Sequence, residues 1–119
     1  MLVVDDDESL RLLCRVNLEL DGYHVLEAAT FVEARELIGR EDIDAVLLDI
    51  HLSDGDGLDL LRELGDRRPP VALFTGTQPA AIDGLGDAVI PKPFEIDELR
   101  ATVEQLVSQE GAGQVDSGR

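Results

Sequence analysis

The sequence predicts an α/β domain in which a parallel β-sheet lies between two layers of helices. Short β-branched and aliphatic runs alternate with segments whose apolar residues recur at helical spacing, which is the pattern of repeated strand and helix units. The run AVLL at residues 45–48 is apolar at every position, as expected for a strand covered on both faces. Polar residues follow these runs, at the edge where parallel sheets bind ligands.

The first half of the chain predicts two strands and two helices. Residues 2–4 form a short apolar strand that ends at an acidic run. From Ser9, apolar residues recur at helical spacing until Gly22, a residue type that is typical of a helix C-terminus. Residues 23–28 form the second strand, and Thr30 can cap the N-terminus of the second helix.

The middle of the chain predicts three further strands. The third covers residues 43–48, and turn-forming residues at 53–57 then precede a short helix. The fourth strand covers residues 71–74 and the fifth covers residues 88–90. Between them, residues 78–86 include one proline and two glycines, so the helix expected there is shortened.

The C-terminal part predicts a last amphipathic helix over residues 95–109. Residues 110–119 are polar and rich in glycine, which indicates a flexible tail or the stub of a linker. We therefore expect one domain over residues 1–109.

Composition limits the possible functions. The chain of 119 residues is long enough for one buried core and too short for two. Its 26 acidic and 10 basic side chains give a net charge of −16, which opposes direct binding to nucleic acid or to anionic membranes. A single cysteine, the absence of a long apolar run and the absence of a visible signal peptide fit a cytoplasmic protein.

Polar residues follow four of the five predicted strands. Asp5 and Asp6 follow the first, Asp49 the third, Thr75 the fourth and Lys92 the fifth. Because the carboxyl ends of parallel strands meet at one edge, these side chains are expected to converge. Three crowded carboxylates repel one another unless a hard cation neutralises them, and Mg²⁺ fits carboxylate ligands better than Zn²⁺ does.

A hydroxyl and an ammonium group beside such a cation can hold phosphoryl oxygens, and Asp49 then becomes a candidate nucleophile that forms an acyl phosphate. Each residue alone has another explanation. The acidic run at 5–7 can cap the first helix, Asp49 can belong to a turn, and Lys92 can be a solvated loop charge. Their combination at the ends of separate strands favours the phosphoryl site.

The motifs VVDDDE, AVLLDIHLSDGDG, ALFTGT and PKPF resemble, in this order, the receiver domain of two-component response regulators, over residues 2–109. The resemblance implies a flavodoxin-like, doubly wound sheet of order 2-1-3-4-5 that is phosphorylated by a sensor histidine kinase or a phosphotransfer protein. It implies these roles: Mg²⁺ ligands Asp5, Asp6, Asp49 and the backbone carbonyl of His51, phospho-acceptor Asp49, switch hydroxyl Thr75, phosphoryl-pairing Lys92, and a cis peptide bond before Pro93.

The sequence also departs from the family pattern. Ser53 stands where the family usually has proline, and Val89 stands where it often has an aromatic switch residue. The usual coupling between the threonine and an aromatic ring is therefore not expected. Pro91 before the lysine is another uncommon choice.

The predicted function is a phosphorylation-dependent signalling switch that catalyses only its own phosphorylation and dephosphorylation. Its expected partners are the kinase and either a downstream protein or a C-terminal output domain. Two alternatives remain: a degenerate receiver-like interaction module that is not phosphorylated, and a metabolic phosphotransferase or phosphatase. The five intact polar residues weigh against the first, and the short chain weighs against the second because it leaves little room for a substrate pocket.

Overall fold

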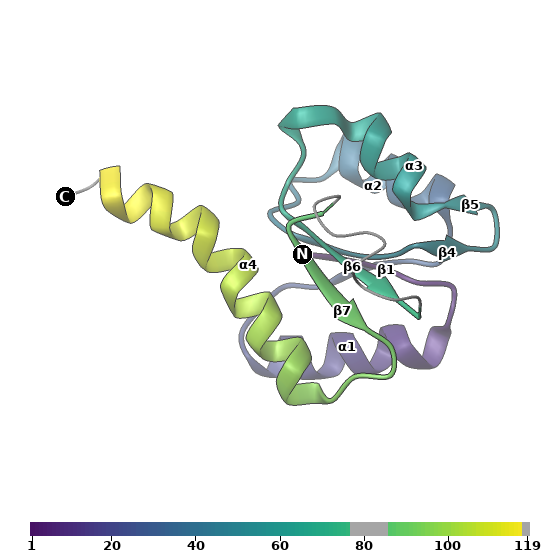
Figure 1. The fold of residues 1–119 in the computed structure, drawn as a ribbon, viewed down its shortest axis with the longest axis horizontal. Helices are drawn as coiled ribbons and strands as arrows, with labels where there is room; N and C mark the ends of the chain where they lie inside the picture. Colours follow the sequence, from purple (N-terminus) through teal and green to yellow (C-terminus); the bar gives the residue numbers. More distant parts are fainter. Residues whose placement is uncertain (77–85, 118–119) are drawn as a thin grey trace.

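The computed structural model describes residues 1–76 and 86–117, which contain strands and helices arranged in layers (Figure 1). In chain order the elements are β1 (Leu2–Val4), α1 (Glu8–Leu20), β2 (Leu26–Ala28), α2 (Phe31–Arg40), β3 (Val46–Asp49), β4 (His51–Leu52), β5 (Gly55–Asp56), α3 (Gly57–Leu64), the short 3-10 helix η1 (Gly65–Arg67), β6 (Val71–Thr75), β7 (Ala88–Pro91) and α4 (Ile96–Ser117). Strands β4 and β5 form a separate antiparallel hairpin.

The main sheet has five parallel strands in the order β2-β1-β3-β6-β7. Counted along the chain within this sheet, the order is 2-1-3-4-5, which confirms the doubly wound, flavodoxin-like fold. The strand order reverses between β1 and β3, so the carboxyl ends of these strands border the crevice at which such sheets bind ligands.

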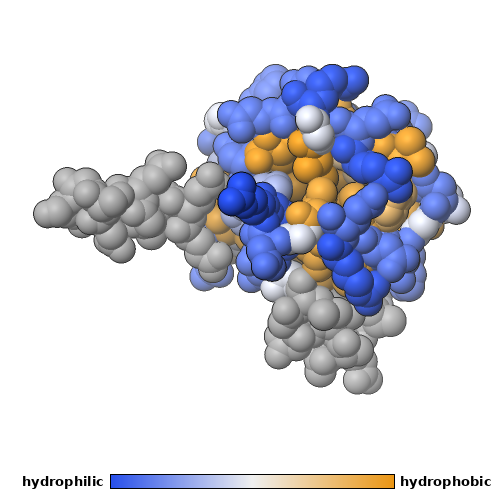
Figure 2. All heavy atoms as spheres, turned by 90° about the horizontal axis from the view of Figure 1, so that it is seen from above, coloured by the Kyte–Doolittle hydropathy of each residue, from blue (hydrophilic) through white to orange (hydrophobic). Residues whose placement is uncertain are grey.

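Two helical layers cover the sheet, α2 and α3 on one face and α1 and α4 on the other (Figure 1). The alternation of side chains along β1 separates the two cores: Leu2 and Val4 pack with the α2 and α3 layer, whereas Val3 packs with the α1 and α4 layer. Figure 2, seen from the side of α2 and α3, shows apolar atoms lying between hydrophilic side chains. All three residues of β1 are fully buried, so this strand is fixed on both faces.

Two strands begin later than their apolar runs predict. The second begins at Leu26 because the preceding residues close the end of α1, where the Tyr23 amide donates to the Leu18 carbonyl oxygen (3.1 Å). Gly22 allows this turn with a φ of 95°. The third strand begins at Val46 and extends to Asp49, so the acidic residue predicted to follow the strand is its last member.

The last helix is longer than its apolar pattern predicts. Its backbone continues to Ser117, beyond the expected end at residue 109. Extending an existing helix adds a hydrogen bond per residue without a new nucleation step, and an amphipathic pattern does not register this. The domain boundary near residue 109 and the linker role of residues 110–119 stay predictions.

The shortened helix predicted within residues 78–86 falls on a segment, residues 77–85, outside the described ranges, so this expectation stays a prediction. Within the described ranges, no helix combines the length and the apolar character needed to cross a bilayer.

Candidate functional site at the carboxyl edge of the sheet

The acidic run after β1 divides its roles among three neighbouring residues. Asp7 caps α1, because its carboxylate accepts hydrogen bonds from the amides of Ser9 (3.0 Å) and Leu10 (3.3 Å). Asp5 is fully buried and its Oδ1 accepts from the Asp7 amide (2.9 Å). Asp6 is exposed between them. Helix capping therefore accounts for Asp7 and leaves Asp5 and Asp6 for the site.

Asp49 is the last residue of β3 and is buried. Its Oδ1 accepts a hydrogen bond from the His51 amide (3.0 Å), which fixes the carboxylate relative to the following loop. The backbone of α3 passes close behind, since the Gly57 amide donates to the Ile50 carbonyl oxygen (2.7 Å). A Cβ atom at Gly57 would overlap the carbonyl oxygen of Asp49, so this position requires glycine.

Lys92 connects the carboxylates of two strands. Its Nζ lies 2.8 Å from Oδ2 of Asp5 and 3.2 Å from Oδ2 of Asp49. The peptide bond between Lys92 and Pro93 is cis, as predicted. The Lys92 amide also donates to the carbonyl oxygen of Thr75 (2.7 Å), so the loop after β7 is held against the end of β6.

The buried charges of this cluster influence one another. Burial raises the pKa of Asp5 above its ordinary value, and the hydrogen bond and charge of Lys92 oppose this rise only in part. Burial alone would lower the pKa of Lys92, but its hydrogen bonds to Asp5 and Asp49 and their charges raise it above its ordinary value. Lys92 is therefore held as a cation between the two carboxylates.

Thr75 ends β6 and is buried. The adjoining residue, Phe74, is paired in register with Asp49 on β3, while Thr75 itself is paired with Pro91 on β7. Val89, at the position of the expected aromatic residue, is partly buried against the core of the α2 and α3 layer. The predicted threonine and acceptor thus lie on neighbouring strands at the same edge of the sheet.

The carboxylates of Asp5, Asp6 and Asp49 place one oxygen each within 4.8 Å of one another. Hard oxygen ligands in this number suit Mg²⁺, which takes one or more carboxylates together with water and phosphate oxygens. Among the described residues, no histidine or cysteine joins the group, so the donor set does not suit Zn²⁺. The role of the His51 carbonyl as a further ligand stays a prediction.

The fold and the edge cluster define a receiver-type domain, and the comparisons agree. The model of the response regulator receiver domain matches residues 1–104. The chain therefore belongs to the response regulator receiver domain family, which acts in phosphorylation-based signalling rather than in metabolic catalysis.

Two relatives and two solved structures illustrate the similarity. Response regulator MprA of Mycobacterium leprae is 36% identical over 114 residues, which cover 90% of this chain and 50% of the relative. The MprA protein of Mycobacterium sp. strain KMS is 38% identical with the same coverage. This chain thus spans about half the length of these curated relatives.

Among solved structures, a CheY-like receiver domain protein from Methanospirillum hungatei has a TM-score of 0.83 at 32% identity, over 93% of this chain and 95% of the other. TrrA from Thermotoga maritima, solved in complex with Mg²⁺ and BeF, has a TM-score of 0.79 at 29% identity, over 88% of this chain and 96% of the other.

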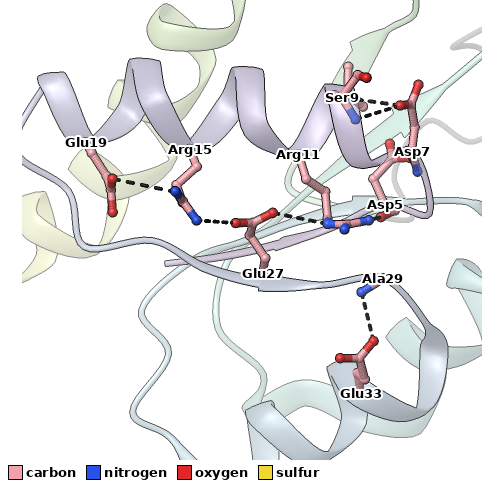
Figure 3. A network of polar contacts seen from close by, with 10 residues as sticks. Asp5, Asp7, Ser9, Arg11, Arg15, Glu19, Glu27, Ala29 and Glu33 are labelled. Carbon is pink, nitrogen blue, oxygen red and sulfur yellow. Dashed lines mark hydrogen bonds and ion pairs between the residues drawn. The ribbon is translucent and has the colours of Figure 1, made fainter.

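Three residues near the site were not singled out for it from the sequence. Gly57 was expected only as a turn residue, because its turn pattern does not show that it faces the backbone of Asp49 and Ile50. Asp54 accepts from the amides of Phe31 (2.7 Å) and Val32 (3.3 Å) and so holds the start of α2. Arg11, on α1, contacts the backbone of Asp5 (Figure 3). The Asp54 contacts join residues more than 20 positions apart, and the contacts at Arg11 and Gly57 involve backbone oxygens, so a pattern of side-chain types gives no signal for any of them.

Proposed function

We propose that this domain accepts a phosphoryl group on Asp49 from a phosphohistidine of a sensor kinase or phosphotransfer protein, in a Mg²⁺-dependent reaction, and passes the signal on by a conformational change. The observation that carries the proposal is the contact of Lys92 with both Asp5 and Asp49 at the crevice of a receiver fold. This contact brings together the carboxylate of Asp49, the carboxylate of Asp5 and the ammonium group of Lys92 from the ends of β3, β1 and β7.

In the proposed reaction, a carboxylate oxygen of Asp49 forms a bond to phosphorus. The bond from phosphorus to the donor's imidazole nitrogen breaks, and its electron pair stays on that nitrogen. The His51 amide and Lys92 already hold the Asp49 carboxylate, so little reorientation is needed before attack.

Asp5, Asp6 and Asp49 are the residues that would hold Mg²⁺, with the His51 carbonyl as a further ligand. A bound Mg²⁺ ion supplies charge neutralisation for the phosphoryl oxygens. The ammonium group of Lys92, which already contacts Asp49, would pair with the same phosphoryl group, and the hydroxyl group of Thr75 would supply a hydrogen-bond donor once the acyl phosphate has formed.

The signal then passes to a further protein or to an output domain. The curated relatives are about twice as long as the matched region, which supports an output domain beyond it in those proteins. We expect the domain to act in the cytoplasm, where a kinase of this class presents its phosphohistidine. The degenerate, unphosphorylated module is not favoured, because Lys92 contacts Asp5 and Asp49 and the carboxylate of Asp6 lies close to both.

The direct test uses phosphoramidate as a small donor with a phosphorus–nitrogen bond, in the presence and absence of Mg²⁺. We expect intact-mass spectrometry to detect one phosphoryl group that hydroxylamine removes, because an acyl phosphate is sensitive to nucleophiles. Asp49→Asn should not be labelled, whereas Asp66→Asn, which removes an exposed carboxylate from η1, should be labelled like the parent. Equal labelling of Asp49→Asn and the parent would exclude Asp49 as the acceptor.

A further inference from the structure

Arg11 reaches from α1 to the backbone of the acidic pair (Figure 3). Its Nη1 donates a 2.7 Å hydrogen bond to the carbonyl oxygen of Asp5, and its Nε donates a 3.2 Å hydrogen bond to Oε1 of Glu27 on β2. The side chain is only 14% exposed. One guanidinium group therefore ties the residue before Asp6 to the neighbouring strand.

The contacted oxygen belongs to the peptide bond that joins Asp5 to Asp6. Because this peptide group is planar, fixing its oxygen also fixes the direction in which the chain leaves toward Asp6. Among the described residues, no side chain or backbone group forms a hydrogen bond with the carboxylate of Asp6 itself. The orientation of Asp6 thus depends on the backbone that Arg11 holds.

Glu27 in turn holds Arg11 in place. Its second oxygen accepts from Nη1 of Arg15 (2.7 Å), and Nε of Arg15 lies 3.8 Å from Glu19, so two arginines and two glutamates alternate along α1 and β2 (Figure 3). The positive charges of Arg11 and Arg15 are balanced within this network. Arg15 belongs to the same network but does not contact Asp5, and it therefore offers a matched control.

Two effects of Arg11 on a cation at the acidic pair oppose each other. Its positive charge repels the cation, while its contact with the Asp5 carbonyl orders the ligands. The charge effect is small because Glu27 neutralises Arg11 at 3.2 Å. The ordering effect is large for Mg²⁺, which requires a nearly ideal octahedral arrangement and responds strongly to the groups that orient its ligands.

We propose that Arg11 is a positioning residue for the Asp5 and Asp6 pair, and that it raises the affinity of the domain for Mg²⁺ by orienting the peptide group between them. This inference rests on the proposed function, since it concerns the same cation. On this proposal, part of the Mg²⁺ affinity depends on Arg11, a side chain on α1 that is not itself a ligand.

The test compares two double variants that leave the net charge unchanged. Arg11→Met/Glu27→Gln removes the contact with Asp5, whereas Arg15→Met/Glu19→Gln removes an equal number of charges and leaves that contact. Calorimetric titration with MgCl₂ should give a dissociation constant about 10-fold weaker for the first variant and nearly unchanged for the second. Arg11→Lys, which preserves the charge and is the mildest change, should also weaken binding because a single ammonium does not reproduce the two-point contact of the guanidinium group.

A second measurement needs no cation. Amide hydrogen exchange at Asp6 and Asp7 in the metal-free protein should be faster in Arg11→Met/Glu27→Gln than in the parent and the Arg15 control. If the parent binds no Mg²⁺ but exchange is still faster in Arg11→Met/Glu27→Gln, the Mg²⁺ dependence of the proposed function is wrong. The role of Arg11 in ordering the backbone of the acidic pair is then still supported. Unchanged exchange, an unchanged dissociation constant in the Arg11 variants, or an equal change in the Arg15 control would overturn the inference.

Discussion

Lys92 donates a 2.8 Å hydrogen bond to Asp5, a residue 87 positions earlier in the chain. The carboxylate of Asp5 is fully buried and lies beside two further carboxylates, so the ammonium group is the positive charge that permits this cluster in the absence of a divalent cation. The contact therefore has a structural role as well as the proposed role in phosphoryl transfer.

We expect Lys92→Met to destabilise the domain in cation-free buffer. The substitution leaves Asp5 buried without its charged donor, and the free energy of unfolding should fall by roughly 1–3 kcal/mol. Arg62→Met is the control, because its ion pair with Asp59 is mostly exposed and should contribute about 0.5 kcal/mol or less. Urea unfolding in EDTA measures both, and a Lys92→Met protein as stable as the parent would contradict this role.

Millimolar Mg²⁺ should raise the melting temperature of the parent, because it binds the folded site and relieves repulsion among the carboxylates. At ten times the dissociation constant, the gain is about 1.4 kcal/mol. Asp6→Asn should be at least as stable as the parent without Mg²⁺ and should not respond to it. Asp7→Asn should keep the response, since asparagine still caps α1; a normal response of Asp6→Asn would remove Asp6 from the ligand set.

Gly57→Ala should be destabilising by roughly 1–3 kcal/mol, because the new methyl group meets the backbone of Asp49 and Ile50, which cannot yield as a flexible side chain can. Gly39→Ala is the matched control, and it should change the free energy of unfolding in the opposite direction. It lies in α2 with open space around the new Cβ, so helix propensity should stabilise the protein by roughly 0.5–1 kcal/mol. Thermal unfolding distinguishes the two, and equal effects would exclude the close approach at Gly57.

Asp54 should make the stability of α2 depend on acidic pH. Hydrogen bonds from the amides of Phe31 and Val32 hold the pKa of Asp54 below its ordinary value. A group with a lowered folded pKa stabilises fully above the unfolded pKa of about 3.9, and this contribution is lost as the pH falls through the lower folded pKa. The stability difference between the parent and Asp54→Asn should be constant above about pH 5 and shrink below pH 4. A difference that does not change with pH would show that Asp54 does not contribute in this way.

The order of the elements could be predicted, because it depends on signals that are local in the chain. The strand order is not a local property, and it was expected only because the motifs resemble those of the receiver family. The capping contact of Thr30 with the Glu33 amide (3.1 Å) and the positive φ of Gly22 confirm two of these signals. Strand starts were less accurate. Tyr23 and its neighbours are apolar enough for a strand but are used by the turn that follows α1, which a hydrophobic pattern cannot distinguish.

The convergence of Asp5, Asp49 and Lys92 could also be predicted, since parallel strands present their carboxyl ends at one edge. Their roles in binding Mg²⁺ and a phosphoryl group stay predictions. The groups that orient the site could not be predicted. Arg11 contacts the carbonyl oxygen of Asp5, and Gly57 leaves room for the carbonyl oxygen of Asp49. Every residue has such an oxygen, so the spacing of side-chain types does not predict either contact.

The distance along the chain between Asp5 and Lys92 has a consequence for folding. The carboxylates of Asp5, Asp6 and Asp49 belong to the half of the chain that is synthesised first, and Lys92 joins them only when β7 pairs with β6 at the edge of the sheet. Closing so long a loop costs chain entropy, so this contact forms among the late, non-local steps. Because Asp5 and Asp49 are buried in the complete fold whereas Asp6 stays exposed, we expect the first two carboxylates to lose their water only when the sheet is completed.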